Sequence, residues 1–360
     1  MTGLFNAFGR AALFSLDPEK AHGLSVAALQ SGLHPRFDPA YDQKLAVQVA
    51  GLHFANPIGM AAGYDKGGQA SAALLAMGFG HTEVGTVTPK PQPGNPKPRV
   101  FRLVKDEAVI NRLGFNSEGH AVVRERLEER GRPKVGLRGI NLGANKTSED
   151  FAADYVTGIA AFAHLADYFT VNISSPNTPG LRALQGADPL ADLLARVSEA
   201  RDGETESHGS KPLFLKIAPD LDQTELDAIA KALEGSGIDA LIVSNTTLGR
   251  EGLRSRDKDE AGGLSGTPLF DLSTKRLAQM YQRIGKTIPL VGVGGVRDAE
   301  TTWQKMEAGA SLVQLYTGMI YAGPGLPAQI LRGLSKRLKA DGAGSIQDIV
   351  GRKADDWAAR

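Results

Sequence analysis

The chain has 360 residues, 42% of them hydrophobic and 22% charged, which is an ordinary balance for a globular protein with a sizeable core. Its 41 basic and 40 acidic residues leave a net charge of +1, which argues against a nucleic-acid partner. The absence of cysteine excludes disulfides, thiolate metal sites, iron–sulfur clusters and a cysteine nucleophile.

Two short helices are expected before the first strand, over residues 3–16 and 18–33, with Asp17-Pro18 between them. Proline in the first turn after an aspartate cap is typical of a helix start. The first segment has apolar residues at helical spacing and a single charge, Arg10. Its apolar residues are Leu4, Phe5, Phe8, Ala12 and Leu16. The pattern indicates a helix that lies in a membrane interface, and the alternative is a helix that covers the floor of the fold.

No apolar run reaches the roughly 18 residues needed to span a bilayer. The N-terminus also lacks the basic, apolar and small-residue pattern of a secretory signal. We therefore expect the chain to stay on the cytoplasmic side.

From about residue 55, short runs rich in Val, Ile and Leu alternate with amphipathic stretches. The runs lack strict polar alternation, which is typical of parallel strands buried on both faces. The expected strands are Asn56–Ala62, Thr82–Val87, Val135–Leu142, Phe169–Ser174, Leu213–Ala218, Ala240–Ser244, Leu290–Gly294 and Ser311–Thr317. The helical stretches include Ser117–Arg130, Ser148–Ala166, Pro189–Ala200, Thr224–Leu233, Ser273–Ile284 and Thr301–Ala308. This repeat predicts an α/β fold, a closed (β/α)8 TIM barrel, whereas an open doubly wound sheet would usually show a Gly-x-Gly-x-x-Gly turn after its first strand.

Two stretches fall outside the repeat. Residues 88–112 are proline-rich and then β-like, which predicts an inserted loop and hairpin above the barrel mouth. The tail from about residue 342 is Gly-rich and then charged, which predicts a loosely attached helix with no assigned function. The expected units are therefore an amphipathic helical segment over 1–34, a catalytic barrel over 35–341 and a tail over 342–360.

In such barrels the active site lies at the carboxyl ends of the strands. Almost every expected strand end here offers an amide, a hydroxyl, a lysine or a glycine, and none offers a carboxylate cluster or histidines at metal-ligand spacing. This set suits a large planar heterocycle beside a small anionic ring better than metal-assisted hydrolysis. Glycines at 292–295 and 318 suit a phosphate bound through backbone N–H groups, although glycines also form ordinary turns at such places.

Eight motifs then follow one another along the chain. They are Ala-Ala-Gly-Tyr-Asp-Lys (61–66), Gly-Thr-Val-Thr-Pro (85–89), Asn-Arg-Leu-Gly-Phe-Asn (111–116), Asn-Ile-Ser-Ser-Pro-Asn-Thr-Pro-Gly-Leu-Arg (172–182), Leu-Lys-Ile-Ala-Pro-Asp (215–220), Ser-Asn-Thr-Thr (244–247), Gly-Gly-Leu-Ser-Gly (262–266) and Gly-Val-Gly-Gly (292–295). In this order they resemble the dihydroorotate dehydrogenases, and the resemblance covers the chain from about residue 15 to 335.

The resemblance implies oxidation of (S)-dihydroorotate to orotate in de novo pyrimidine biosynthesis. One non-covalent FMN per chain would accept a hydride from C6 while a base takes the C5 proton. The family pattern places that base at Ser175 and a proton path at Phe115 and Thr178. Serine is a poor base unaided, so the site must enclose it and provide the path. Alone, a serine beside Pro176 would be interpreted as a turn or capping hydroxyl.

The resemblance also implies which residues read the substrate. Orotate is a flat anion edged with amide groups, which amide side chains can match with paired donors and acceptors. The substrate set is Lys66, Asn111, Arg112, Leu113, Gly114, Phe115, Asn172, Asn177, Asn245 and Thr246. Lys66 would supply charge for the substrate carboxylate. A lone asparagine is usually a turn residue, but turns explain poorly four amides that converge from separate segments.

For the flavin, the informative residue is Lys216, which sits in an apolar strand where an unpaired ammonium is costly. One interpretation is a lysine that reaches out of the barrel. The resemblance instead puts it by the flavin N1/C2 edge, where a cation stabilises the reduced ring. The implied flavin contacts are Ala61, Ala62, Gly63, Tyr64, Asp65, Thr86, Asn141, Asn172, Lys216, Ser244, Gly266, Gly295, Tyr316 and Thr317.

Within the family, the chain resembles the quinone-linked, membrane-associated type. The soluble type uses cysteine as its base and lacks the N-terminal helices, whereas this chain has Ser175 and about 34 residues before the barrel. His22, Arg102 and Tyr316 match polar residues of the family's quinone tunnel. The resemblance thus implies a membrane quinone as acceptor, a monomer, and peripheral contact with the lipid bilayer at the cytoplasmic face.

Two rival interpretations remain open at this point. A tRNA-dihydrouridine reductase is another FMN barrel, but it normally has a basic RNA-binding surface and a cysteine acid. A non-enzymatic flavin-binding scaffold would be expected to have lost Ser175, Lys66 or the asparagines, and all of them are present.

Overall fold

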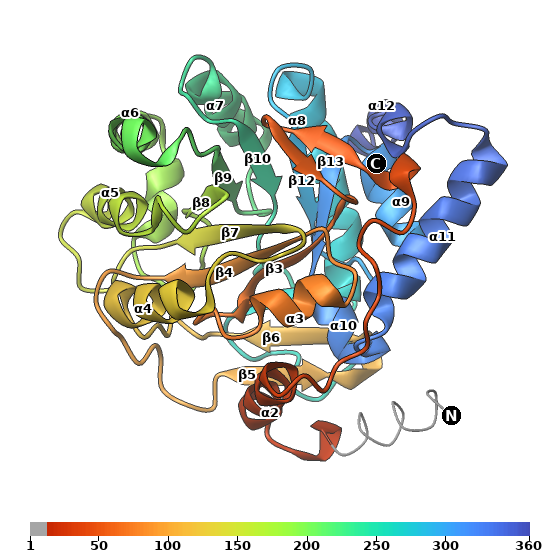
Figure 1. The fold of residues 1–360 in the computed structure, drawn as a ribbon, viewed down its shortest axis with the longest axis horizontal. Helices are drawn as coiled ribbons and strands as arrows, with labels where there is room; N and C mark the ends of the chain where they lie inside the picture. The colour runs from red at the N-terminus through yellow and green to blue at the C-terminus, as the bar shows by residue number, and fades with distance from the viewer. Residues whose placement is uncertain (1–12) are drawn as a thin grey trace.

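The computed structural model describes residues 13–360, and its centre is one closed barrel of eight parallel strands (Figure 1). In order around the barrel these are β3 (Ile58–Asp65), β4 (His81–Val87), β7 (Leu137–Leu142), β8 (Tyr168–Asn172), β9 (Leu213–Ile217), β10 (Ala240–Val243), β12 (Leu290–Val293) and β13 (Ala310–Leu315). Pairing of Val313 with Ile58 joins the last strand to the first. The predicted barrel and its eight strands are confirmed, with small shifts at the strand ends.

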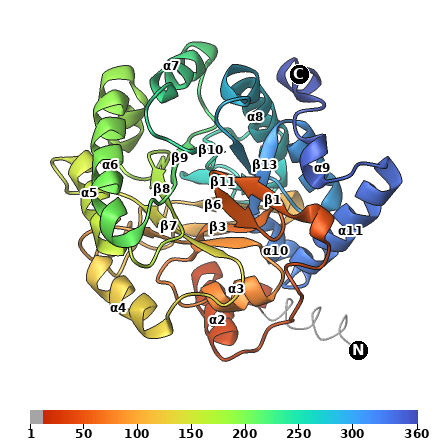
Figure 2. The same cartoon turned by 45° about the horizontal axis from the view of Figure 1, so that its top comes forward.

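Burial explains why these short runs form strands. Every residue of β4, β8, β9 and β10 is buried, as expected for parallel strands covered on both faces. The covering helices form an outer ring (Figure 2). They are α3 (Ser71–Ala76), α4 (His120–Arg130), α5 (Phe151–Phe162), α6 (Ala187–His208), α7 (Gln223–Leu233), α8 (Phe270–Ile284), α9 (Ala299–Glu307) and α11 (Leu326–Asp341).

A hairpin closes the floor of the barrel. It consists of β1 (Val47–Val49) and β2 (Leu52–Phe54), which pair antiparallel. The Phe54 ring lies 5.2 Å from the His81 ring and 6.5 Å from the Tyr168 ring, measured between centroids. His81 and Tyr168 are the first residues of their strands, so the hairpin covers the amino-terminal end of the barrel.

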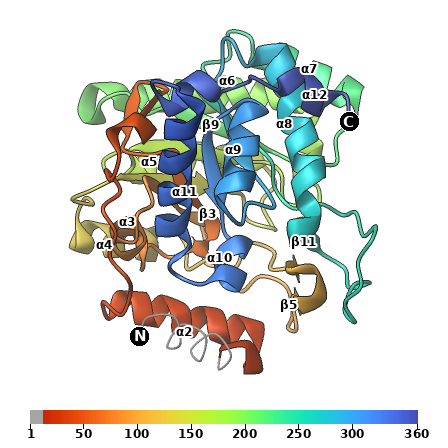
Figure 3. The same ribbon diagram turned by 90° about the vertical axis from the view of Figure 1, so that its right-hand side faces the viewer.

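The opposite end carries a second layer. The predicted hairpin is confirmed as β5 (Val100–Leu103) and β6 (Ala108–Asn111), and an unexpected third strand, β11 (Gly263–Gly266), pairs with β6. Helix α2 (Pro18–Gln30) lies beside β5 at this end, near the short helix α10 (Thr317–Ala322) (Figure 3).

Helix α2 confirms the predicted helix start. Pro18 is its first residue, and the Asp17 side chain accepts hydrogen bonds from the backbone of Glu19 at 3.1 Å and Lys20 at 3.0 Å. The expected helix over 3–16 falls outside the described residues apart from its end, where residues 13–15 are helical. Within residues 13–360, no helix is both long and apolar enough to cross a membrane.

The C-terminal tail is firmly packed, so the loose attachment expected for it is wrong. Its last helix, α12 (Ala354–Ala358), packs against α8. Ile346, Ile349 and Trp357 are buried, and the Trp357 ring meets the Phe270 ring edge-on at 5.9 Å. In the sequence these three apolar residues stand in a charged stretch without helical or strand periodicity, so their burial was not predicted.

Candidate active site

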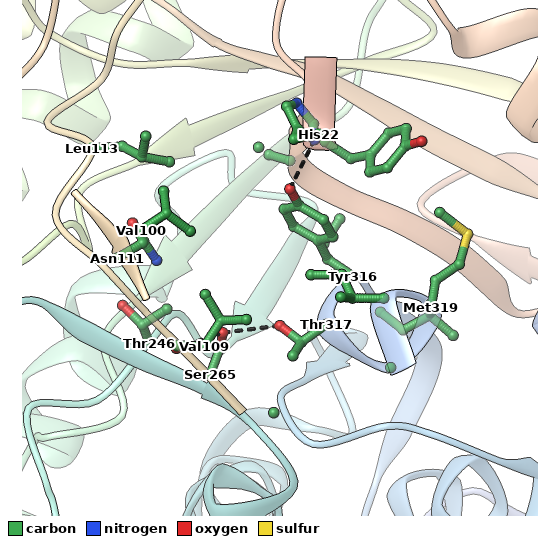
Figure 4. A pocket seen from close by; sticks show the side chains of 18 of the residues that line it. His22, Val100, Val109, Asn111, Leu113, Thr246, Ser265, Tyr316, Thr317 and Met319 are labelled. Carbon is green, nitrogen blue, oxygen red and sulfur yellow. Dashed lines mark hydrogen bonds between the residues drawn. The ribbon is translucent and has the colours of Figure 1, made fainter. Parts of the chain in front are cut away.

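A cavity of about 470 Å³ opens at the carboxyl ends of the strands, beneath α2 and the three-stranded sheet (Figure 4). It brings together nearly all the residues predicted for the site, from segments far apart in the sequence. Those that do not line it are Asp65, Arg112, Asn141 and Thr178. One cavity therefore connects the predicted substrate, flavin and quinone residues. Among the described residues, no group of acidic or histidine side chains has metal-binding geometry.

Three of the four exceptions make supporting contacts. The Asp65 carboxylate accepts hydrogen bonds from Ser71 Oγ and the Gln69 N–H, both at 2.6 Å. Arg112 pairs with Glu260 at 2.6 Å, turned away from the cavity. Asn141 lies behind Thr86, whose hydroxyl donates to its Oδ1 at 2.6 Å.

The loop after β8 holds the predicted base. Ser175 is 5% exposed and lines the cavity, and its Oγ accepts a hydrogen bond from the Asn177 N–H at 3.2 Å. The Asn177 amide donates to the Asn111 carbonyl at 3.2 Å, which ties this loop to the end of β6. The Arg182 guanidinium donates to the Ser174 carbonyl at 3.1 Å. These contacts hold the Ser175 hydroxyl in a fixed place at the mouth.

Of the two residues predicted for a proton path, Thr178 is buried and Phe115 is partly buried. Phe115 has a positive φ of 52°, which is uncommon outside glycine, and Gln92 donates to its carbonyl at 2.8 Å. A Cβ at Gly143 would lie 2.9 Å from the Phe115 ring, so the ring rests directly on that backbone. Thr178 Oγ1 is buried and has no hydrogen-bond partner among the described residues.

Both predicted lysines reach the cavity. Lys66 Nζ donates to the Gly63 carbonyl at 2.8 Å, and burial lowers the pKa of Lys66 to about 8. Burial also lowers the pKa of Lys216, while the negative charge of Glu83 opposes that effect. Lys216 is 4% exposed and lines the cavity, so the interpretation of a lysine reaching out of the barrel is wrong.

The glycine turns after β12 and β13 form a narrow part of the same cavity. Gly295 has a φ of +74°, and a Cβ there would lie 2.4 Å from the Phe270 Cβ. Only glycine fits, and its bare backbone is open to close approach by a ligand. Ser265 and Thr317 add hydroxyls, whose oxygens lie 2.9 Å apart (Figure 4). Ser265 was not predicted, because a serine in Gly-Leu-Ser-Gly resembles a turn residue until β11 forms.

The predicted quinone residues lie where α2 meets the barrel. His22 Nδ1 and the Tyr316 hydroxyl are 3.2 Å apart (Figure 4), and the Tyr64 ring lies 5.2 Å from the His22 ring. Burial lowers the pKa of His22 to about 3, so the ring is neutral near pH 7. Arg102 Nη1 donates to the Leu13 carbonyl at 3.0 Å. The surrounding lining is apolar and includes Phe14, Ala28, Leu29 and Met319.

Fold and site together define a (β/α)8 barrel with a cavity at the carboxyl ends of its strands, lined by amides, hydroxyls and two lysines and continuing into an apolar channel under α2. The comparisons then specify the family. The family model described as "Dihydroorotate dehydrogenase" matches residues 44–338. Proteins named "Dihydroorotate dehydrogenase (quinone)" from Brucella anthropi and Agrobacterium fabrum are each 58% identical over 362 residues, covering 100% of this chain and 99% of each relative.

Solved structures agree with this result. DHODH from Eimeria tenella in complex with ferulenol matches with a TM-score of 0.90 and 39% identity, covering 94% of this chain and 96% of that one. The ligand-free structure matches with a TM-score of 0.89 and 40% identity, covering 94% and 99%. The chain belongs to the dihydroorotate dehydrogenase family, whose members are flavin-dependent oxidoreductases.

Proposed function

We propose that this protein oxidises dihydroorotate to orotate in pyrimidine biosynthesis, using one non-covalent FMN per chain and a membrane quinone as the final acceptor. The relatives named above are quinone-type enzymes, matched over the whole chain. The observation that carries the proposal is the single cavity that joins the Ser175 loop, Lys216 and the apolar channel under α2.

At the substrate end, Asn111, Asn172, Asn177 and Asn245 would read the amide edges of the ring, and Lys66 would face the carboxylate. All of them line the cavity. The Ser175 hydroxyl would take the C5 proton, because it is enclosed yet held at the mouth by the Asn177 N–H. The buried hydroxyl of Thr178, on the same loop, is suited to pass the proton outward.

The residues present fit a flavin mononucleotide. Such a flavin supplies hydride acceptance and one- or two-electron return to a quinone. Lys216 would place a cation at its ring, and Thr86 and Asn172 would contact the polar edge. The positive-φ turn at Gly295, with the hydroxyl of Thr317, would hold the phosphate through backbone N–H groups.

The quinone would enter between α2 and the barrel. His22, Arg102 and Tyr316 would contact its polar head, while Phe14, Leu29 and Met319 would line the path of its tail. Leu24 and Leu33 of this region are exposed, at 53% and 75%, as suits a surface that rests on lipid. We propose that a monomer binds the cytoplasmic face of the membrane peripherally in this way.

Steady-state oxidation of dihydroorotate with quinone, fumarate or NAD as the only acceptor tests the proposal. We expect turnover with quinone alone. The purified protein should also release FMN on acid treatment, one per chain. Release of FAD, or turnover with NAD or fumarate in place of quinone, would contradict the proposal.

A further inference from the structure

Glu83 of β4 is a fully buried carboxylate inside the barrel, directly behind the site. Its Oε1 accepts hydrogen bonds from Gln314 Nε2 at 2.6 Å and Thr170 Oγ1 at 3.1 Å, and the Tyr168 hydroxyl lies 3.5 Å away. Its Oε2 accepts from Asn141 Nδ2 at 2.8 Å. Burying a carboxylate is expensive, so its place in the barrel needs a reason beyond packing.

The carboxylate determines which way Asn141 points. A carboxylate has no hydrogen to donate, so the Asn141 group that faces Glu83 must be the NH2. Asn141 Oδ1 therefore faces the cavity side, where it accepts from Thr86 Oγ1 at 2.6 Å and from Asn172 Nδ2 at 3.1 Å.

The following side chains have the matching orientation, and backbone N–H groups hold the far end of the network: Ser174 N–H donates to Asn172 Oδ1 at 3.3 Å and Thr246 N–H to Asn245 Oδ1 at 2.8 Å. With Asn172 Nδ2 donating to Asn141, Asn172 Oδ1 faces Ser174 and accepts from its hydroxyl at 2.7 Å. Ser174 has then used its only hydrogen, so its Oγ accepts from Asn245 Nδ2 at 2.8 Å. Four links, from Glu83 through Asn141, Asn172 and Ser174 to Asn245, run in one direction.

We propose that Glu83 is a positioning residue that fixes the donor–acceptor polarity of Asn141, and so matches it to the amides at the flavin and substrate. The inference rests on the proposed function, because it assigns ligand reading to Asn172 and Asn245. An amide offers a donor and an acceptor from nearly the same shape, so packing alone cannot choose between its two orientations. The backbone N–H groups of Ser174 and Thr246 make that choice for Asn172 and Asn245, and the buried carboxylate makes the matching choice for Asn141, so the connected network is satisfied from both ends.

Glu83→Gln tests the proposal with almost no change of volume. The glutamine oxygen can still accept from Gln314 and Thr170, which puts its NH2 against the NH2 of Asn141. If Asn141 keeps its orientation, the two NH2 groups repel each other; if it turns over, its NH2 meets the NH2 of Asn172, whose oxygen the Ser174 N–H holds in place. Either way the network is no longer satisfied. We expect flavin reduction by dihydroorotate to slow by about 10- to 100-fold, as for other lost supporting contacts. The affinity for orotate, measured from the change in flavin absorption as orotate is added, should fall by a similar factor. Dithionite should still reduce the bound flavin.

A second substitution should restore the polarity. In Glu83→Gln with Asn141→Asp, the new carboxylate accepts from the glutamine on one side and from Thr86 and Asn172 on the other. The buried negative charge is kept, but it moves from residue 83 to residue 141, which is nearer the site. We expect this double variant to recover most of the lost rate and orotate affinity. Thr170→Val is the matched control, because it removes a donor to Glu83 without altering polarity, and its rate should stay close to that of wild type.

Each variant is first checked for folding and flavin content. If the single variant does not fold, near-wild-type orotate binding by the double variant still supports the proposal, and its loss overturns it. Unchanged kinetics in Glu83→Gln, a double variant no better than the single one, or an equal loss in Thr170→Val would also overturn it. A wild-type protein whose flavin is not reduced by dihydroorotate would instead contradict the proposed function.

Discussion

The two halves of the cavity are built in different ways. The substrate half is made by side chains of the barrel strands and of the loops directly after them, and its amides are joined in a network that reaches the buried Glu83. The channel half lies between α2, which is outside the barrel, and the strand β5 and helix α10, which carry Arg102 and Met319. The polar contacts between α2 and the rest of the protein include the Arg99–Glu19 pair and the contact between His22 and Tyr316.

This difference indicates that the two half-reactions depend on separate structures. The geometry around Ser175 is set mainly by the barrel and the loops after its strands, so we expect a change at α2 to affect it little. The channel depends on how one helix docks on the mouth, so modest changes there should alter quinone turnover alone. The following predictions test that separation.

The largest effect is expected at the rigid half. Ser175→Ala should slow flavin reduction by dihydroorotate by roughly 10² or more, the usual range for a lost general base. Orotate binding should change little, because the asparagines remain, and stopped-flow absorbance of the flavin measures both. Flavin reduction at near wild-type rate would show that the base has been misassigned.

Removal of residues 1–34 should affect the other half. In a folded truncation, dihydroorotate should still bleach the flavin, but turnover with a long-tailed quinone should fall by at least about tenfold, since the apolar lining supplied by α2 is lost. Vesicle binding should fall with it. Stability must be checked first, because Arg99 and Tyr64 lose their cover. Equal losses in both half-reactions would contradict the separation.

Lys66 links pH to the substrate half. Its pKa of about 8, lowered mainly by burial, means that the free site loses a positive charge as pH rises through that value. Orotate affinity should therefore be constant below about pH 8 and then fall by at most about tenfold per pH unit. Lys66→Arg should remove this dependence, because arginine stays charged. Titrating orotate against flavin absorption from pH 6 to about 10 checks it.

The smallest effect is expected from Glu19→Gln, which weakens the docking of α2. Arg99 Nη2 lies 2.6 Å from Glu19 Oε1, and the Arg99 side chain is 7% exposed. Loss of the pair should cost about 1 kcal/mol after solvent screening and raise the KM for quinone a few-fold. Flavin reduction should be unchanged at a pH well below the pKa of Lys66, which the Glu19 charge helps to raise. Lys97→Met is the control, because Lys97 is 68% exposed at 3.5 Å from Glu19 and should contribute nothing measurable. Slower flavin reduction in Glu19→Gln under these conditions would show that the docking of α2 also affects the substrate half, against the proposed separation.

The barrel was predictable because each strand is buried on both faces and so appears as an apolar run. The ends of the helices and strands were less predictable, and α6 shows why. Its apolar period stops near Ala200, but the helix continues to His208 with mostly exposed polar residues, stabilised by pairs such as Arg201 with Asp239. Strand β11 was missed because two of its four residues are glycine, which carry no strand signal.

The candidate site was located largely through motifs, and the structure brings most of those residues to one cavity. The sequence could not show which way each side chain points. The run His-Thr-Glu-Val-Gly does not show that Glu83 points into the barrel toward Asn141. A charged residue in an apolar strand does indicate that the charge has a buried partner. The position of α2 at the mouth rather than the floor also depends on long-range contacts, such as His22 with Tyr316.

The packing of the C-terminal tail bears on how the protein is made. Helix α12 rests on α8, and Phe270 at the start of α8 lies against the Gly295 turn. The barrel itself closes only when β13 pairs with β3, near the opposite end of the sequence. During synthesis the earlier strands must therefore wait, half-covered, for segments that emerge last. The cavity at the barrel mouth is therefore complete only after β13 has paired with β3, and loss of Trp357 would remove the ring that meets Phe270, the residue against which the Gly295 turn rests.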